Sequence, residues 1–259
     1  MASGGMHGHS AACCTVPPVT ANNSPPEKGA WTEVDGMKTY VTGQTEGKEA
    51  LLVVYDIFGF FPQTLQGADI LGQKYKVFVP DFFEGNPADV SWYPPDTQEK
   101  GEKLGNFFKT TGAPPKTAER IPKVVQQLQQ MKENAGVEKW GILGYCWGGK
   151  IVALTTQKGT PFKVGAACHP AMVDPKDAEG AAVPIALLPS KDEPKEDVEK
   201  WEKTIKQKSL VKWYPDQVHG FMAARADLTD DNVRKNYEDG YQVLLDWFGQ
   251  HLGGSASKI

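Results

Sequence analysis

The sequence predicts a doubly wound α/β domain, in which a mostly parallel sheet is flanked by helices. Three observations predict this class: short apolar runs recur along the chain, longer amphipathic stretches alternate with them, and glycine or proline marks many junctions. Strands that are apolar along their whole length are typical of a sheet covered on both faces, as parallel sheets are. Strands that alternate with helices are typical of doubly wound domains.

Six apolar runs are the predicted strands. Each is followed by a turn or by a longer amphipathic stretch, and their continuous hydrophobicity predicts positions inside a covered sheet. The runs span residues 51–59, 76–83, 140–146, 163–170, 183–192 and 210–215.

Four amphipathic stretches are the predicted helices: 117–136, 148–159, 194–209 and 229–253. Glycine ends the first two, proline and acidic residues open the third, and Thr229 is the predicted cap of the fourth. Pro122 marks a start or a kink within the first stretch. Residues 86–115, rich in proline, glycine and aromatic residues, break the alternation and are predicted to form a cap or long excursion.

Composition indicates one globular domain over residues 30–259, preceded by a flexible tail over residues 1–29 that is rich in glycine, serine and proline. Among the 259 residues, 40% are hydrophobic and 23% are charged, which is typical of a globular chain. The net charge of −4, with both signs interspersed, excludes a basic footprint for nucleic acid or an anionic membrane. No apolar stretch approaches the ~20 residues that span a bilayer. The tail also lacks the basic start and apolar core of a secretory signal.

The cysteines and histidines of the tail do not have the spacing of a zinc site, so no metal is expected. These residues are His7, His9, Cys13 and Cys14. With only Cys146 and Cys168 in the predicted domain, no disulfide framework is expected, which favours a cytoplasmic location. The last three residues, Ser257, Lys258 and Ile259, resemble the S-K-L peroxisomal address, so a peroxisomal location is the alternative.

The motif GILGYCWGG places Cys146 where a predicted strand ends and a predicted helix begins. Small residues at Gly144 and Gly148 allow the close approach of strand and helix that a nucleophile elbow needs. The nucleophile then projects above the sheet, while N–H groups at the start of the helix face a developing oxyanion. The backbone N–H groups of Trp147 and of Ile57, in the loop DIFGF, are the predicted donors.

A thiol becomes a good nucleophile beside a base, and that base needs an orienting acid. In α/β-hydrolase folds the chain order is nucleophile, acid, histidine. His219 lies in YPDQVHGF, after the last predicted strand, and Asp192 lies in LLPSKDEP, after the preceding one. The predicted triad is therefore Cys146, His219 and Asp192, with Glu193 as the nearest competitor for the acid.

Structural alternatives remain open for these residues. Cys146 could be a packed thiol, His219 a loop histidine, and Asp192 a turn or capping residue. Cys168 and His169 follow a predicted strand where ligands gather in open sheets, but core packing is the favoured interpretation.

Five motifs in this order, DIFGF, VPDFFEG, GYCWGG, KDEP and HGF, resemble the dienelactone hydrolase family over roughly residues 31–252. The resemblance implies an α/β-hydrolase fold and a Cys-His-Asp triad that cleaves lactones and related esters through a thioester. It also implies that Asp56, where relatives often have glutamate, contacts the resting thiol. Arg225 is implied as a substrate-binding residue, with a weaker correspondence at Arg120.

We therefore expect a cysteine-dependent carboxylic ester hydrolase acting on a small lactone or activated ester, without metal or organic cofactor. Phe58 and Trp92 are candidate walls of its pocket, although aromatic residues near a core are often packing residues. The alternatives are a thioesterase or carboxylesterase for other esters, and a non-catalytic, redox-sensitive binding protein of the same fold. The expected partner is a small molecule, without nucleic acid or membrane, and the chain is expected to be a monomer or homodimer.

Overall fold

The computed structural model describes residues 18–19 and 27–253. Their strands form one eight-stranded sheet in the order β1-β2-β4-β3-β5-β6-β7-β8. The strands are β1 Ala30–Val34, β2 Met37–Gly43, β3 Glu49–Val54, β4 Lys76–Pro80, β5 Lys139–Tyr145, β6 Val164–Cys168, β7 Ile185–Leu188 and β8 Ser209–Val211. Strands β3 to β8 pair in parallel with their neighbours among themselves, while β1 and β2 add an antiparallel edge beside β4. The predicted doubly wound, mostly parallel α/β class is confirmed.

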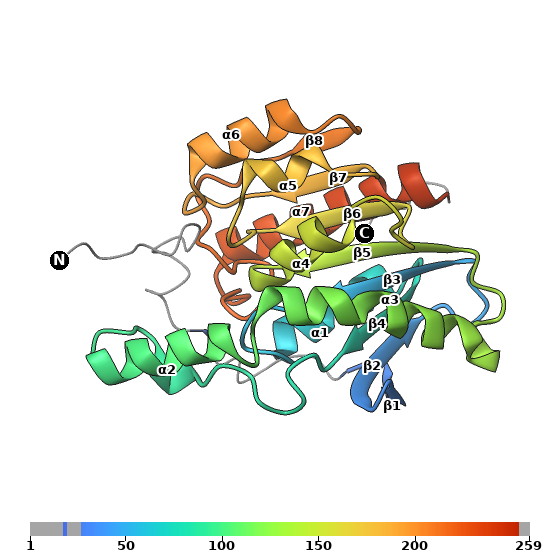
Figure 1. Ribbon diagram of the computed structural model, residues 1–259, viewed down its shortest axis with the longest axis horizontal. Helices are drawn as coiled ribbons and strands as arrows, with labels where there is room; N and C mark the ends of the chain where they lie inside the picture. The colour runs from blue at the N-terminus through green and yellow to red at the C-terminus, as the bar shows by residue number, and fades with distance from the viewer. Residues whose placement is uncertain (1–17, 20–26, 254–259) are drawn as a thin grey trace.

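Helices cover both faces of this sheet (Figure 1). The helices are α1 Pro62–Leu71, α2 Gln98–Lys109, α3 Pro114–Gln130, α4 Trp147–Thr155, α5 Pro175–Glu179, α6 Lys195–Thr204 and α7 Asp231–Leu252, with 3₁₀ turns at Val90–Trp92 and Lys132–Asn134. Helices α1 and α7 contact each other on one face, and α3 and α4 contact each other on the opposite face. No helix within the described residues is both long and apolar enough to cross a membrane.

Local sequence explains the central elements. Strands β3 and β5 pair over six positions and are almost wholly buried, as their apolar sequences predict. Helix α3 buries one side through Ile121, Val124, Val125 and Leu128, which recur at helical spacing. It begins at Pro114 rather than at residue 117 because two prolines fit its first turn, and Pro122 lies inside it.

The predicted excursion of residues 86–115 contains the turn Val90–Trp92 and helix α2. This segment lies at the end of the sheet where the parallel strands finish (Figure 1). Thr97 caps α2 by accepting a hydrogen bond from the N–H of Lys100. The cap of α7 is Asp230, not Thr229, because its carboxylate accepts hydrogen bonds from two N–H groups of the first turn.

Part of the predicted tail contacts the domain. The N–H of Val19 donates to the carbonyl of Ala224 at 2.9 Å, and its carbonyl accepts from the Gln63 amide at 3.0 Å. The remaining tail positions discussed above, His7, His9, Cys13 and Cys14, lie outside the described residues, as do residues 257–259.

Candidate active site

Cys146 stands at the corner between β5 and α4 with a φ of +52° and a ψ of −111°. Non-glycine residues rarely adopt such a left-handed backbone, and it turns the cysteine out of the strand direction. A side-chain Cβ at Gly144 would lie 2.1 Å from the carbonyl of Gly148, and one at Gly148 would lie 2.2 Å from the carbonyl of Val54. Both glycines are therefore required by backbone contact, and the corner has the geometry of a nucleophile elbow.

Backbone hydrogen bonds hold this corner against the neighbouring strand. The N–H of Cys146 donates to the carbonyl of Cys168 at 3.1 Å. The carbonyl of Cys146 accepts from Gly149 at 3.0 Å and from Ala171 at 2.9 Å. The thiol residue is only 3% exposed, so it lies under the surface formed by the surrounding loops.

The two predicted oxyanion donors lie on the elements expected for them. Trp147 is the first residue of α4, where helical N–H groups have no intrahelical acceptor. Ile57 lies in the loop after β3, and its carbonyl accepts from Ala88 at 2.8 Å. The indole of Trp147 donates to the carbonyl of Gly112 at 2.8 Å. Both donor residues are thus tied by hydrogen bonds to residues of the 86–115 excursion.

The acid that contacts the histidine ring is Glu193, not Asp192. A Glu193 Oε1 atom lies 2.6 Å from Nδ1 of His219, and both side chains are almost completely buried. The backbone N–H of Ser190 donates to the other oxygen of Glu193, and the Ser190 hydroxyl donates to Oε1 at 3.2 Å. The ring is therefore held by a carboxylate that is itself fixed by hydrogen bonds.

Asp192 has a different position in the same turn. Its Oδ2 atom accepts the backbone N–H of His219 at 2.8 Å, and its own N–H donates to the Ser190 hydroxyl at 3.2 Å. Adjacent residues in this turn present their carboxylates to different parts of His219. The pattern KDEP does not indicate which of the two faces the ring, so sequence reasoning had no signal to choose Glu193.

Asp56 lies at the end of β3 and is 3% exposed. Its Oδ1 atom accepts from the N–H of Phe58 at 2.9 Å, and Oδ2 accepts from the N–H of Ala224 at 3.2 Å. Burial raises the pKa of Asp56 to about 6, although these N–H groups and the charges of Arg225 and His219 act in the opposite direction. The carboxylate thus links the loop after β3 to the loop that follows His219. Its predicted contact with the thiol stays a prediction.

Arg225 is 5% exposed and lies within the site rather than on the surface. Its guanidinium donates to the carbonyl of His219 at 3.2 Å. The same group lies 5.7 Å from the ring centre of Phe58 and 5.9 Å from that of Tyr93, as in cation–π contacts. Arg120, the weaker candidate, instead pairs with Asp35 and Glu84. It belongs to a surface ion-pair group away from His219.

His169 packs beside the candidate base. Its ring centre lies 5.2 Å from that of His219 and 5.9 Å from that of Tyr145, and the residue is fully buried. Within the described chain neither ring nitrogen of His169 has a hydrogen-bond partner. Burial, reinforced by the charges of His219 and Arg225, lowers its pKa well below the ordinary value. The favoured packing interpretation of His169 agrees with this geometry.

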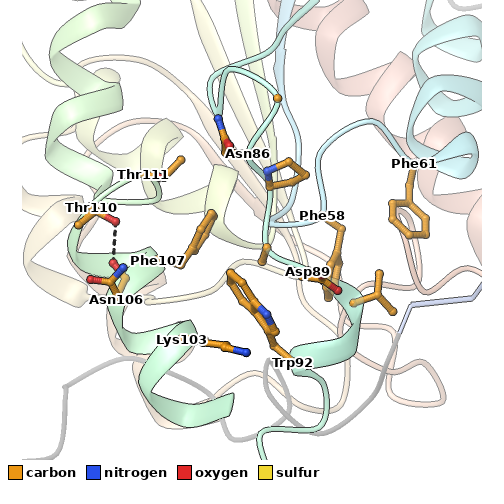
Figure 2. A pocket seen from close by; sticks show the side chains of 14 residues that line it. Phe58, Phe61, Asn86, Asp89, Trp92, Lys103, Asn106, Phe107, Thr110 and Thr111 are labelled. Carbon is orange, nitrogen blue, oxygen red and sulfur yellow. Dashed lines mark hydrogen bonds between the residues drawn. The ribbon is translucent and has the colours of Figure 1, made fainter. Parts of the chain in front are cut away.

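The candidate pocket residues Phe58 and Trp92 both line a cavity of about 570 Å³ beside the site (Figure 2). The ring centre of Phe58 lies 5.7 Å from the guanidinium of Arg225, and Trp92 comes from the turn that precedes α2. Among the described residues there is no group of three or more His, Cys, Asp or Glu side chains that could hold a metal ion.

The dienelactone hydrolase family model matches residues 37–252. The AIM2 family protein C30D10.14 of Schizosaccharomyces pombe is 36% identical over 92% of this chain and 98% of its own. The human carboxymethylenebutenolidase homolog is 25% identical, covering 86% of this chain and 91% of its own.

Solved structures show the same α/β-hydrolase fold. A dienelactone hydrolase from Anabaena variabilis superposes with a TM-score of 0.60 at 13% identity, covering 88% of this chain and 99% of its own. A soluble variant of monoglyceride lipase from Saccharomyces cerevisiae superposes with a TM-score of 0.55 at 12% identity, covering 89% and 97%. The family model matches most of the described chain, a relative more than 30% identical aligns over nearly all of it, and the fold is the expected one. This chain therefore belongs to the dienelactone hydrolase family and is a hydrolase.

Proposed function

We propose that this protein hydrolyses carboxylic esters or lactones through an acyl-thioester on Cys146. His219 is the proposed general base, Glu193 orients its ring, and the N–H groups of Ile57 and Trp147 stabilise the oxyanion. The observation that carries the proposal is the buried pair of Glu193 and His219 at 2.6 Å, together with the nucleophile-elbow backbone of Cys146.

Acylation begins with proton transfer from the thiol to His219. When Nδ1–H donates to Glu193, Nε2 is the basic nitrogen, and it accepts the proton of Cys146. The sulfur forms a bond to the substrate carbonyl carbon, and the carbonyl oxygen becomes an oxyanion facing the two N–H groups. The carbon–oxygen bond of the ester then breaks, and the leaving oxygen takes the proton from Nε2. In a lactone the released hydroxyl remains attached to the acyl group.

Deacylation repeats these steps with water. His219 accepts a proton from water while the hydroxide oxygen bonds to the thioester carbon. Collapse of the intermediate breaks the carbon–sulfur bond, and the thiolate regains its proton from the histidine. The net result is one carboxylic acid and one alcohol for each ester and water consumed, and the enzyme returns to its starting form.

The substrate class is supported by the chemistry of a thiol and by the relatives. The oxygen of an enol-lactone or activated ester leaves with little help, and that of an alkyl ester leaves as it takes the proton from Nε2, whereas an amide nitrogen needs full protonation. The human relative is named a carboxymethylenebutenolidase homolog, and a relative from Aspergillus violaceofuscus at 28% identity is named a hydrolase.

A panel of simple esters and enol-lactones tests the proposal on the wild type beside Cys146→Ala and Cys168→Ala. Cys168 is the matched control, because it is also a buried free cysteine but its thiol is not part of the proposed triad. We expect turnover by the wild type and by Cys168→Ala, and none by Cys146→Ala. Unchanged turnover in folded Cys146→Ala would contradict the nucleophile, and no turnover by the wild type would favour the binding-protein alternative.

A further inference from the structure

The cavity of about 570 Å³ lies between the loop after β3 and helix α2. Its aromatic walls are Phe58, Phe61, Trp92 and Phe107 (Figure 2). This volume lies within the range of small-molecule sites, and polar side chains line the cavity together with the aromatic ones.

One wall continues directly into the first proposed oxyanion donor. Phe58 follows Ile57 in the chain, and its N–H bonds to Asp56 at 2.9 Å. Ala88, another lining residue, donates its N–H to the carbonyl of Ile57 at 2.8 Å. A ligand in the cavity would therefore touch the residues that hold Ile57 in place.

The opposite wall leads to the second donor. The ring of Phe107 lies 5.1 Å from that of Phe83, whose ring lies 4.7 Å from that of Trp147. Trp147 follows Cys146 and carries the second proposed donor. The cavity is thus framed by aromatic residues joined to both halves of the proposed oxyanion hole.

Part of the apolar lining is exposed. Val90 is 38% exposed, and Trp92 and Phe61 are half-buried. A partly exposed aromatic side chain in a cavity is stabilised when a second aromatic ring stacks against it or meets it edge to face. Among the described residues Val90 and Trp31 are the exposed large apolar side chains, and Val90 lines the cavity.

Polar side chains also line the cavity. Asn106 and Lys103 come from α2, and Asn86 and Asp89 come from the segment before the turn (Figure 2). Lys103 pairs with Glu99 at 2.7 Å on the exposed side of α2. A ligand with an apolar ring inside and polar substituents at its outer edge would match this distribution.

We propose that the cavity binds a planar aromatic group of the substrate, so that the enzyme prefers aryl-substituted esters or lactones to small aliphatic ones. This inference rests on the proposed function, since it extends the same site. Trp92 is the specificity-determining residue because its half-buried ring would stack against the aromatic group while the carbonyl lies at Cys146.

Two matched ester pairs test the preference, with acid release followed by a pH indicator. The pairs are methyl 3-(2-naphthyl)propanoate with methyl butanoate, and 2-naphthylmethyl acetate with butyl acetate. In Trp92→Ala we expect kcat/KM to fall on the order of tenfold for at least one naphthyl ester and less than about twofold for both aliphatic esters. Trp92→Phe should recover much of the loss. Trp31→Ala is the matched control, because Trp31 is 37% exposed on β1 and does not line the cavity.

Equal kcat/KM values for naphthyl and aliphatic esters in the wild type, or equal losses for both in Trp92→Ala, would overturn the inference. Failure to hydrolyse any of the four esters, together with failure on every ester and enol-lactone of the panel above, would instead overturn the proposed function. Calorimetric titration with 3-(2-naphthyl)propanoate would then test the cavity by itself. Binding by the wild type that weakens about tenfold in Trp92→Ala supports the aromatic site, and absence of binding refutes it.

Discussion

Replacing the two adjacent carboxylates one at a time separates their roles. Glu193→Gln removes the charge that faces Nδ1 of His219 at 2.6 Å. Asp192→Asn keeps an oxygen that can accept the backbone N–H of His219, which the carboxylate now accepts at 2.8 Å. Glu193→Gln removes the negative charge that stabilises the protonated ring of His219, whereas Asp192→Asn weakens only a hydrogen bond to the backbone of His219.

The expected magnitudes differ strongly. Positioned acid–base catalysis contributes about 10²- to 10⁴-fold, so kcat/KM should fall by a factor in this range in Glu193→Gln. Hydrogen bonds to charged acceptors are stronger than neutral ones by about 1 kcal/mol, so Asp192→Asn should lower kcat/KM by about fivefold or less. Glu193→Gln also leaves the Ser190 N–H and hydroxyl with a less suitable acceptor. Its free energy of unfolding should fall by about 1–3 kcal/mol.

The assay combines ester hydrolysis with alkylation of Cys146 by iodoacetamide, since both depend on deprotonation of the thiol. Urea unfolding of each variant establishes that the folded fraction is the same under assay conditions. A larger loss of both rates in Asp192→Asn than in Glu193→Gln would refute the assignment. It would return the orienting role to Asp192.

Substitutions at three further positions test the corner, the buried acid and the packed histidine. In Gly148→Ala the new Cβ would lie 2.2 Å from the carbonyl of Val54, so the free energy of unfolding should fall by more than about 2 kcal/mol in urea; a change below about 0.5 kcal/mol would contradict the close approach. Asp56 has a folded pKa of about 6 against an ordinary value of 3.8, so between these pH values the folded state holds a proton that the unfolded state has released, and stability falls as pH rises. Relative to the wild type, Asp56→Asn should therefore gain about 2 kcal/mol between pH 4 and pH 6.5, whereas a constant difference in urea unfolding would argue against the raised pKa. The ring centre of His169 lies 5.2 Å from that of His219, and its ring nitrogens accept or donate no hydrogen bond within the described chain. His169→Phe should therefore retain kcat/KM within about threefold, whereas His169→Ala should lose about tenfold. Equal losses in the two variants would point to a role for the nitrogens.

Central strands were predictable because burial on both faces leaves a continuous apolar run. β3, β4 and β5 lie within two residues of the predicted starts, although each ends sooner because the predicted runs included the following loop. The edge strands β1 and β2 escaped prediction. β1 is mostly exposed and β2 mixes polar with apolar residues, so neither has an apolar run.

The elbow was predictable because its requirement is local: two glycines flank a cysteine where a strand meets a helix. Which acid contacts the histidine ring was not predictable, because Asp192 and Glu193 are neighbours and only the path of the turn decides which carboxylate reaches the ring. The position of Arg225 under Phe58 and Tyr93 likewise depends on contacts between segments distant in sequence. Residues far apart in the chain share a site only through the fold, and single-residue patterns carry no such distances.

Intact-mass spectrometry during turnover of a slow ester tests the central proposal most directly. The wild type should gain the mass of the acyl group, with the adduct mapped to Cys146 by peptide analysis and released by hydroxylamine as a thioester. Cys146→Ala should show neither adduct nor turnover. Turnover without any adduct, or an adduct on another residue that accounts for the rate, would contradict thioester catalysis at Cys146.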